Sequence, residues 1–353
     1  MTMPKRQEPP RRSLGTKATR REPLPWAEEE FRLLSIDGGG IRGILPAAIL
    51  AECERRFLDG RSVAVHFDLV AGTSTGGIIA LGLASDLSAS DILSRYLEQG
   101  QAVFPRVSRR HPLRRALQHG WLGLKAVGVA RYDSAALAHL LDDILGERLF
   151  GDAEVRLVIP SFDQHHEVNV FKTPHHPDYR LDWKEAMVSV ARATSAAPTY
   201  LPVFALGERR FGDGGLWANN PIMLGLVDVL ACHAVERHTV RVLSLGCGSR
   251  NRPMSWAQAN LGGLFVWRKA HETAMQLASE NALGQAGLLI GRERLLRLDH
   301  RFLDDEIELD DYERAATELP LIARALVEAH EGELSQFFDA PRPPYTRFHP
   351  GNG

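Results

Sequence analysis

Cysteine is scarce in this chain, whose 353 residues include only Cys53, Cys232 and Cys247. An odd and small number of cysteines excludes a disulfide scaffold and predicts a reducing compartment. The net charge of −2 provides no overall attraction to polyanions, so we expect no DNA or RNA partner. The basic N-terminal residues are not followed by an apolar stretch, which argues against a secretory signal and favours a cytoplasmic location.

A convincing membrane-spanning run is also missing. Residues 67–84 are apolar over a length that could suggest a transmembrane helix. However, Asp68, a cluster of Ser and Thr and several glycines would find no polar partners in lipid. A buried strand, a turn and a buried helix explain this stretch better. With 44% hydrophobic and 24% charged residues, the composition predicts a globular protein with a substantial core.

Both ends of the chain differ in composition from its body. Residues 1–26 are rich in proline and basic side chains and poor in apolar ones, which predicts a disordered basic arm. We expect one domain over residues 27–340 and a flexible tail over residues 341–353. Within the domain, residues 101–131 are strongly basic and predict a long functional or mobile loop. Residues 299–313 are strongly acidic and predict a solvated surface.

Strand-like and helix-like segments alternate through the body of the chain. The expected strands are residues 31–36, 66–71, 155–161, 168–172 and 240–246, and the expected helices are residues 44–57, 76–84, 89–99, 134–145, 183–193, 221–235 and a long region around 255–290. Ser88 with Asp91 predicts a capping box, and Asp133 predicts a second helix cap. This alternation indicates an α/β fold whose mainly parallel sheet is covered by helices on both faces.

The segment Gly72-Thr73-Ser74-Thr75-Gly76 fits the nucleophile-elbow pattern G-x-S-x-G. The pattern needs its glycines because a sharp turn from strand to helix leaves no room for Cβ atoms beside the serine. Here the segment follows an expected strand and precedes an expected helix, which is the context that the pattern requires. The sequence therefore predicts an exposed Ser74 hydroxyl at the positive end of the following helix.

A glycine-rich segment, DGGGIRG (residues 37–43), directly follows the first expected strand. Consecutive glycines let backbone N–H groups converge on one point, which suits an oxyanion. The same segment satisfies the dinucleotide fingerprint G-x-G-x-x-G through Gly38, Gly40 and Gly43. That fingerprint demands an acid at the end of the second strand, whereas Asp68 lies inside the second expected strand. A glycine loop followed by a serine elbow favours acyl chemistry.

A catalytic serine needs a base, and an aspartate is the better candidate than a histidine. The late histidines His233, His238, His271, His300 and His330 all lie in helical or charged surroundings, without a glycine turn at a strand end. Asp213 follows a short apolar segment and precedes Gly214 and Gly215, which permit close backbone approach. A carboxylate within hydrogen-bond reach of a serine hydroxyl can act directly as its general base.

In this order, DGGGIRG, GTSTG and DGG resemble the patatin-like phospholipase family, and ATSAAPTYLPV (193–203) and DGGLWANNP (213–221) extend the resemblance over about residues 31 to 250. The resemblance implies a three-layer α/β/α fold with a mainly parallel central sheet. It implies Ser74 as nucleophile and Asp213 as base, Gly38, Gly39, Gly40 and Arg42 as the oxyanion loop, and Gly43, Gly72, Gly76, Gly214 and Gly215 as motif glycines. It further implies hydrolysis of acyl esters in membrane glycerophospholipids, without a metal or an organic cofactor.

A narrower resemblance comes from IPSFD (159–163) and VFKTPHHPDYRLDW (170–183), which look like bacterial patatins that serve as effectors of cyclic-oligonucleotide antiphage signalling. We therefore expect a cyclic di- or trinucleotide activator, self-association, and action at the inner membrane surface. The basic residues 101–131 and the segment 164–180 are the expected effector sites, unless they contact anionic lipid headgroups instead. The histidines of this region, His165, His166, His175 and His176, lack metal-site spacing and predict polar loop residues.

Two alternatives to this function stay open. One is a constitutive lipid acyl hydrolase without nucleotide control. The other, of a different class, is a nucleotide-binding regulatory module that uses the G-x-G-x-x-G loop without hydrolysis.

Overall fold

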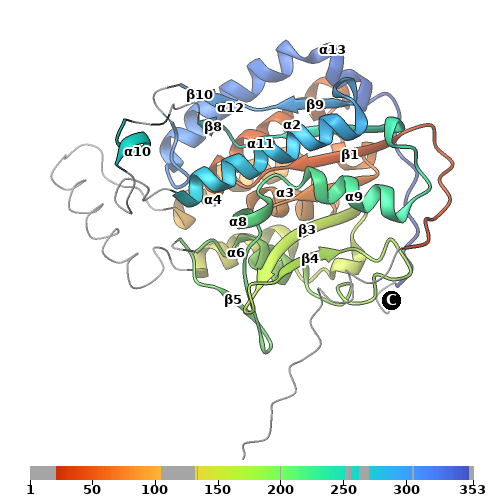
Figure 1. Cartoon of the computed structure of the whole chain (residues 1–353), viewed down its shortest axis with the longest axis horizontal. Coiled ribbons are helices and arrows are strands. Elements are labelled where there is room, and N and C mark those ends of the chain that lie inside the picture. Colours follow the sequence, from red (N-terminus) through yellow and green to blue (C-terminus); the bar gives the residue numbers. More distant parts are fainter. Residues whose placement is uncertain are drawn as a thin grey trace, which may run out of the picture.

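The structure of the protein, a computed structural model, describes residues 21–104, 132, 134–198, 200–250, 254, 256–261, 270–303 and 306–349. A β-sheet lies at the centre, with helices on both of its faces (Figure 1). The predicted three-layer α/β/α architecture is confirmed.

Most strands of the central sheet are parallel. Its strands are β1 (Phe31–Ile36), β2 (Leu69–Gly72), β3 (Arg156–Asp163), β4 (Val168–Lys172), β5 (Phe204–Leu206), β6 (Arg209–Asp213), β7 (Val240–Leu245) and β9 (Leu295–Leu298). Within the described residues their order is β5-β6-β3-β2-β1-β7-β9, with β4 paired to β3. The run from β3 to β9 is parallel, whereas β4, β5 and β6 form antiparallel pairs. Two short strands, β8 (Ser249–Arg250) and β10 (Arg301–Phe302), pair separately.

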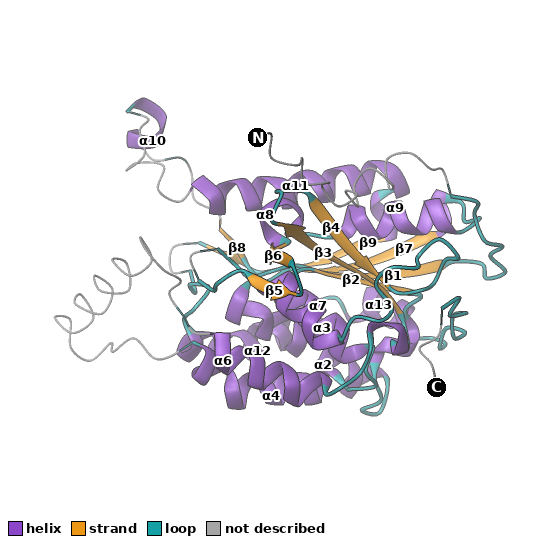
Figure 2. Cartoon of the chain, turned by 90° about the horizontal axis from the view of Figure 1, so that it is seen from below, coloured by secondary structure: helices purple, strands orange, loops and turns teal. Residues whose placement is uncertain are grey.

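The two helical layers differ in size (Figure 2). The larger layer holds α2 (Ile44–Phe57), α3 (Thr75–Leu83), α4 (Ala89–Val103), α6 (Ser134–Leu145), α7 (Met187–Ser195), α12 (Tyr312–Ala329) and α13 (Glu331–Leu334). The other layer holds α8 (Gly215–Ala218), α9 (Ile222–Cys232) and α11 (Ala270–Ile290), and α10 (Trp256–Asn260) projects from the body. Short 3₁₀ turns occur at Gly40–Gly43, Val63–His66, Phe150–Asp152, Arg237–Thr239, Arg292–Arg294 and Ser335–Phe337.

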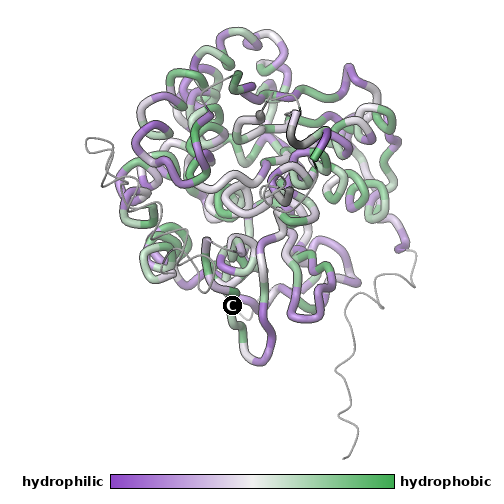
Figure 3. The backbone as a smooth tube through the Cα atoms, turned by 60° about the vertical axis from the view of Figure 1, so that its left-hand side comes forward, coloured by the Kyte–Doolittle hydropathy of each residue, from purple (hydrophilic) through white to green (hydrophobic). Residues whose placement is uncertain are grey.

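Each face of the sheet has its own hydrophobic core. Successive side chains of a strand point to opposite faces, so Leu34 joins the core under α2 and α3, whereas Leu33 joins the core under α9. All six residues of β1 are buried, and four of them are apolar, as expected for a central strand covered on both faces. The outer helices alternate between hydrophobic and hydrophilic residues along their turns (Figure 3), as expected for helices that cover a sheet.

The sheet topology brings three loops to one edge. Ile36 and Gly72 are partners at the carboxyl ends of β1 and β2, so the segments that follow both strands emerge side by side. β3 continues past its pairing with β2, and β6 returns antiparallel along this extension, with Asp213 opposite Ser161. Asp213 is thereby carried to the edge where β2 ends.

The predicted elements are largely confirmed, and the differences have physical reasons. β1, α2, β4 and the capping box of Ser88 and Asp91 lie where expected, whereas Asp133 lies outside the described residues. The long helical region around 255–290 is split into α10 and α11, with residues 262–269 outside the described part. The strands β5, β6, β8, β9 and β10 were not predicted because each has five residues or fewer, and the short helices α8 and α13 were missed for the same reason. The helix α12 was missed because it follows an acidic segment.

The chain ends also differ from expectation. Within the expected arm, Leu24 exchanges backbone hydrogen bonds with the residues around His233, and the Trp26 ring lies 4.5 Å from that of Phe31. Within the expected tail, the Arg342 guanidinium lies 3.0 Å from the Asp68 carboxylate, an ion pair buried by the body. Residues 1–20, 105–131 and 350–353 lie outside the described part. We propose that the single domain extends over residues 21–349.

Candidate active site

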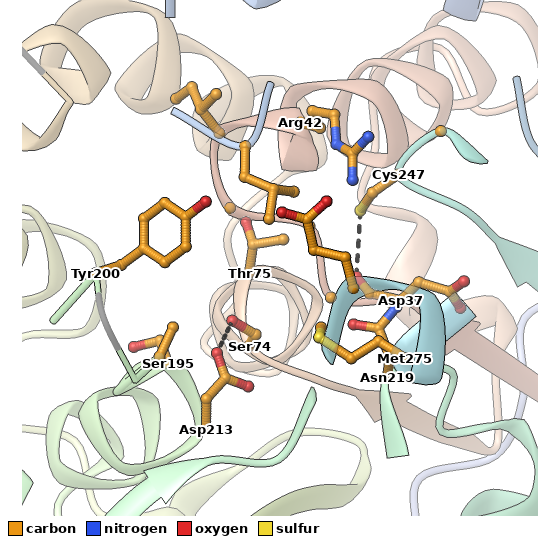
Figure 4. A pocket seen from close by; sticks show the side chains of 18 of the residues that line it. Asp37, Arg42, Ser74, Thr75, Ser195, Tyr200, Asp213, Asn219, Cys247 and Met275 are labelled. Atoms are coloured by element: carbon orange, nitrogen blue, oxygen red, sulfur yellow. Dashed lines mark hydrogen bonds between the residues drawn. The ribbon is translucent and has the colours of Figure 1, made fainter. Parts of the chain in front are cut away.

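Ser74 occupies the turn between β2 and α3, and its Oγ donates a 2.6 Å hydrogen bond to Oδ2 of Asp213 (Figure 4). The φ of Ser74 is 53°, a left-handed conformation that is rare for a residue other than glycine. Neighbouring groups hold this strained turn: the Ser74 N–H donates to Oγ1 of Thr194, whose hydroxyl donates to the carbonyl of Pro160. The elbow therefore presents its hydroxyl in one fixed direction.

The glycines of the elbow are required by close backbone contacts. A Cβ at Gly72 would lie 2.3 Å from the carbonyl oxygen of Gly76. A Cβ at Gly76 would lie 2.3 Å from the carbonyl oxygen of Ile36. Gly43 faces the first residue of α3, since a Cβ there would lie 2.1 Å from Oγ1 of Thr75. These distances agree with the expected reason for glycine at each position.

Asp213 ends β6 and is only 6% exposed. Its second oxygen, Oδ1, accepts a 2.7 Å hydrogen bond from the N–H of Gly215. Burial raises the pKa of Asp213 to about 6, and the hydrogen bonds from Ser74 and Gly215 only partly oppose this shift. A carboxylate whose pKa lies near neutrality is well suited to accept a proton from a serine and to return it.

The glycine loop follows β1 on the other side of Ser74. The N–H of Gly38 donates to the carbonyl of Asn219 at 3.0 Å, so this amide is already engaged. Among the described residues, the N–H groups of Gly39 and Gly40 donate to no protein acceptor. The loop lies close to the elbow, since a Cβ at Gly38 would lie 3.3 Å from the Cβ of Ser74. Two unused donors thus lie in the segment that borders the nucleophile.

Arg42 is anchored by an acid rather than free in the site. Its Nη1 donates a 2.8 Å hydrogen bond to Oε1 of Glu306, and the side chains are 11% and 9% exposed. The prediction of a solvated acidic surface over residues 299–313 is therefore wrong for Glu306. Asp311 is also engaged, because it caps the N-terminus of α12. These partners were not visible in the sequence, since 264 positions separate Arg42 from Glu306.

A cavity of about 220 Å³ opens from Ser74 and Asp213. One part of its wall is apolar and is formed by Ile78, Val103, Phe104, Leu137, Leu140 and Leu201. The other part carries polar groups, with Asp37, Arg42, Asn219 and Cys247 around the glycine loop (Figure 4). A largely apolar pocket with a few polar groups beside the nucleophile can hold an acyl chain and place its ester at the serine.

Three residues at this site were missed as contributors by the sequence analysis. Thr194 supports the elbow, Asn219 accepts from Gly38, and Cys247 packs against Gly39, where a Cβ would lie 2.2 Å from the Cβ of Cys247. Thr194 and Asn219 belong to segments that carry the family resemblance, which was the available signal. Nothing near Cys247 in the sequence indicated its position.

None of the late histidines whose side chains are described lines the cavity. His233 is buried against Trp26 and Phe31, where burial lowers its pKa to about 3. His175 lies in a loop, as predicted, but it is buried there and bonds to the Asp228 carboxylate at 2.7 Å. Within the described part of the chain, no group of three or more His, Cys, Asp or Glu side chains could hold a metal ion.

The dinucleotide interpretation of the glycine loop lacks its acidic partner. Asp68 directly precedes β2 and therefore lies at the opposite edge of the sheet from the loop. Its carboxylate accepts from the N–H of Arg32 and pairs with Arg342, so it serves the packing of the chain ends. A ribose bound beside Gly38–Gly40 would be out of its reach.

Comparison with known proteins agrees with this geometry. The family model described as patatin-like phospholipase matches residues 34–226. A cGAMP-activated phospholipase of Pseudomonas aeruginosa is 38% identical over 72% of this chain and 76% of its own length. A protein of the same name from Vibrio cholerae is 34% identical over 74% of this chain and 78% of its own length. A third, from Escherichia coli, is 31% identical over 90% of this chain and 95% of its own length. The chain belongs to the patatin-like phospholipase family, and with it to the hydrolases.

One further finding concerns the membrane. Within the described part of the chain, none of the helices combines the length and the apolar character that crossing a bilayer requires.

Proposed function

We propose that this protein hydrolyses the acyl esters of membrane glycerophospholipids through a Ser74–Asp213 dyad. The observation that carries the proposal is the 2.6 Å hydrogen bond between the strained elbow serine and a buried carboxylate. The family membership of residues 34–226 and the apolar wall of the cavity support a lipid substrate.

The proposed reaction uses the groups of this site in turn. Asp213 takes the proton of Ser74 while Oγ attacks the ester carbonyl, and the free N–H groups of Gly39 and Gly40 hold the developing oxyanion. Asp213 then gives its proton to the departing alcohol of the lysophospholipid. Water then attacks the acyl group while Asp213 takes its proton, and Asp213 returns that proton to Oγ of Ser74 as the bond to the acyl group breaks and the fatty acid leaves. In this scheme Arg42 orients the loop through Glu306.

The dyad is tested with Ser74→Ala and Asp213→Ala on a soluble ester and on phospholipid vesicles. Both variants should lose nearly all turnover, since residues that act as a unit fail together. Ser195→Ala is a matched control, because Ser195 lines the same cavity but donates its hydroxyl to the Ala191 carbonyl. Substantial turnover by Ser74→Ala would show that the nucleophile is wrongly assigned.

A fluorophosphonate probe separates this function from the nucleotide-binding alternative. The probe labels an activated serine, so it should modify the wild type and Ser195→Ala but not Ser74→Ala. A regulatory module that only binds nucleotides would remain unlabelled in every form.

We also propose that a cyclic di- or trinucleotide activates the enzyme at the inner membrane surface, through self-association and as part of antiphage defence. The names of the three relatives support a cyclic-dinucleotide activator. Of the expected effector segments, residues 105–131 lie outside the described part, and in 164–180 the exposed side chains include His165, His166 and Arg180. Lys172 and His175 bind the carboxylate of the buried Asp228, so they are not among these exposed side chains.

Activation is tested by hydrolysis of a soluble ester, which removes the membrane from the comparison. A cyclic nucleotide such as cGAMP should raise the rate and should shift the protein to larger species in analytical ultracentrifugation. If no member of a panel of cyclic nucleotides binds or raises the rate, the enzyme is a constitutive acyl hydrolase.

A further inference from the structure

The glycine loop that borders Ser74 is held at both ends by residues 297–309. This segment lies outside the matched residues 34–226, and no motif of the sequence points to it. Its described residues, 297–303 and 306–309, comprise the end of β9, the strand β10 and residues that precede α12.

The first contact holds the start of the loop. Arg297 lies on β9, and its guanidinium binds the Asp37 carboxylate through two bonds, Nη1 to Oδ1 at 3.1 Å and Nη2 to Oδ2 at 2.7 Å. Nη1 also donates to the hydroxyl of Ser244, and Nη2 to the carboxylate of Asp299. A planar guanidinium bound on two sides fixes the plane and the position of the carboxylate that it holds. Asp37 is only 3% exposed, whereas the Arg297 side chain is 20% exposed, so the carboxylate is the part of this pair that is shielded from water.

The second contact holds the end of the loop. The N–H of Ile41 donates to the carbonyl of Leu309 at 3.0 Å. Gly40 has a φ of +56°, and a Cβ there would lie 2.5 Å from the same carbonyl oxygen, so only glycine permits this approach. Arg42, the residue after Ile41, is bound to Glu306 at 2.8 Å.

We propose that residues 297–309 position the oxyanion loop and that Arg297 is the main positioning residue. The inference rests on the proposed function. Gly39 and Gly40 lie between the two contacts, and their N–H groups have no acceptor among the described residues. Such donors stabilise an oxyanion only when they already point at it, because turning them during the reaction would cost free energy. Both Arg297 and Asp37 border the cavity, and Arg297 acts on the loop through its two bonds to Asp37.

The test compares Arg297→Met and Arg297→Lys with the wild type on a soluble ester. We expect kcat for Arg297→Met to fall by about 10²-fold with little change in KM, because a small misplacement of catalytic groups has effects of that size. Arg297→Lys keeps the charge but loses the two-sided contact, and should lie between Arg297→Met and the wild type.

Inhibitor binding distinguishes a positioning role of Arg297 from a purely structural one. A trifluoromethyl ketone lipid forms a tetrahedral adduct with an oxyanion, so its affinity should fall in parallel with kcat/KM. An ether analogue of the phospholipid forms no oxyanion, so its affinity should stay unchanged. Equal losses for both inhibitors would overturn the proposal.

Arg32 is the matched control. It lies near the start of β1, the strand whose other end leads to Asp37, and like Arg297 it is paired with two carboxylates, those of Glu30 and Asp339. Arg32→Met should lower Tm without changing kcat per folded molecule. If Arg297→Met does not fold, the kcat of Asp37→Asn tests the positioning role instead, because this variant keeps the shape of the side chain and removes the ion pair. Wild-type kcat in the folded variant would overturn the positioning role. An error in the dyad assignment would be recognised separately, because Ser74→Ala would then still turn over the ester.

Discussion

The Oγ of Ser74 and the Oδ2 of Asp213 are 139 positions apart in the chain and 2.6 Å apart in space. The pairing of β6 with the extended end of β3 produces this contact, because it carries the aspartate to the edge where β2 ends. Both residues are buried, with 8% and 6% exposure, so Ser74 lines the cavity instead of being exposed as the sequence predicted.

The pH dependence of the rate should follow Asp213. Its pKa of about 6 means that kcat/KM on a soluble ester should fall below pH 6, about tenfold per unit, because the protonated carboxyl cannot accept the serine proton. A pH–rate profile between pH 4.5 and 8 measures this limb. Burial also raises the pKa of Asp37 to about 6, and its protonation would weaken the ion pair with Arg297 that supports the loop. Asp37→Asn removes this second titration, so it should be slower overall and keep a limb of about tenfold per unit; any additional steepness of the wild-type limb is assigned to Asp37. A flat profile down to pH 5 would contradict the assignment.

Asp213 should reduce the stability of the folded protein at neutral pH. Its pKa is raised from 3.8 to about 6, so the folded state binds the proton more tightly and stability falls as pH rises through that window. Asp213→Asn removes this cost and should raise the free energy of unfolding at pH 8 by on the order of 1–3 kcal/mol. Urea titrations at pH 8 and pH 4 measure the change. A gain that is larger at pH 4 would contradict the prediction.

Gly39 should tolerate a methyl group only if Cys247 gives way. Gly39→Ala places a Cβ 2.2 Å from the Cβ of Cys247, which must displace the loop. We expect kcat to fall by about 10²–10³-fold, as when an oxyanion donor is lost, with a smaller effect on KM. Gly39→Ala with Cys247→Gly removes the clashing atoms and should recover much of the rate. Steady-state kinetics measures kcat of both variants, with Cys247→Gly alone as the reference. If the double variant is as slow as Gly39→Ala, the loss does not have a steric cause.

No histidine should be essential for hydrolysis. Single replacements of His238, His271, His300 and His330 should each leave a measurable rate, as should the size-matched His233→Phe in its aromatic surroundings. EDTA should leave turnover of a soluble ester unchanged, since the proposed steps use only side-chain and backbone groups. A folded variant that loses all activity would restore a Ser–His–Asp triad.

The sequence predicted best what depends on neighbours in the chain. The buried run of β1, the helical spacing of α2 and the glycines around Ser74 are local patterns, and all three were interpreted correctly. The approach of Asp213 to Ser74 was expected from the family resemblance, and no residue spacing could have supplied it.

The contacts that organise the glycine loop were beyond sequence reasoning. Ion pairs between residues 260 or more positions apart, such as Arg297 with Asp37, leave no periodic pattern. The acidic composition of residues 299–313 suggested solvent exposure, although Glu306 is buried against Arg42. Nor could the sequence show that the N–H of Gly38 donates to the carbonyl of Asn219. Only the N–H groups of Gly39 and Gly40 then stay available for an oxyanion among the three glycines.

The attachment of the glycine loop to residues 297–309 also bears on the synthesis of the enzyme. The ribosome makes Arg297 more than 200 positions after the serine elbow, a delay of roughly 10–45 s at ordinary translation rates. During that interval the nascent chain holds Ser74, and later Asp213, without the partners that fix Asp37 and Ile41. If residues 297–309 position the oxyanion loop as we propose, a growing polypeptide gains an organised loop only after this segment has been made.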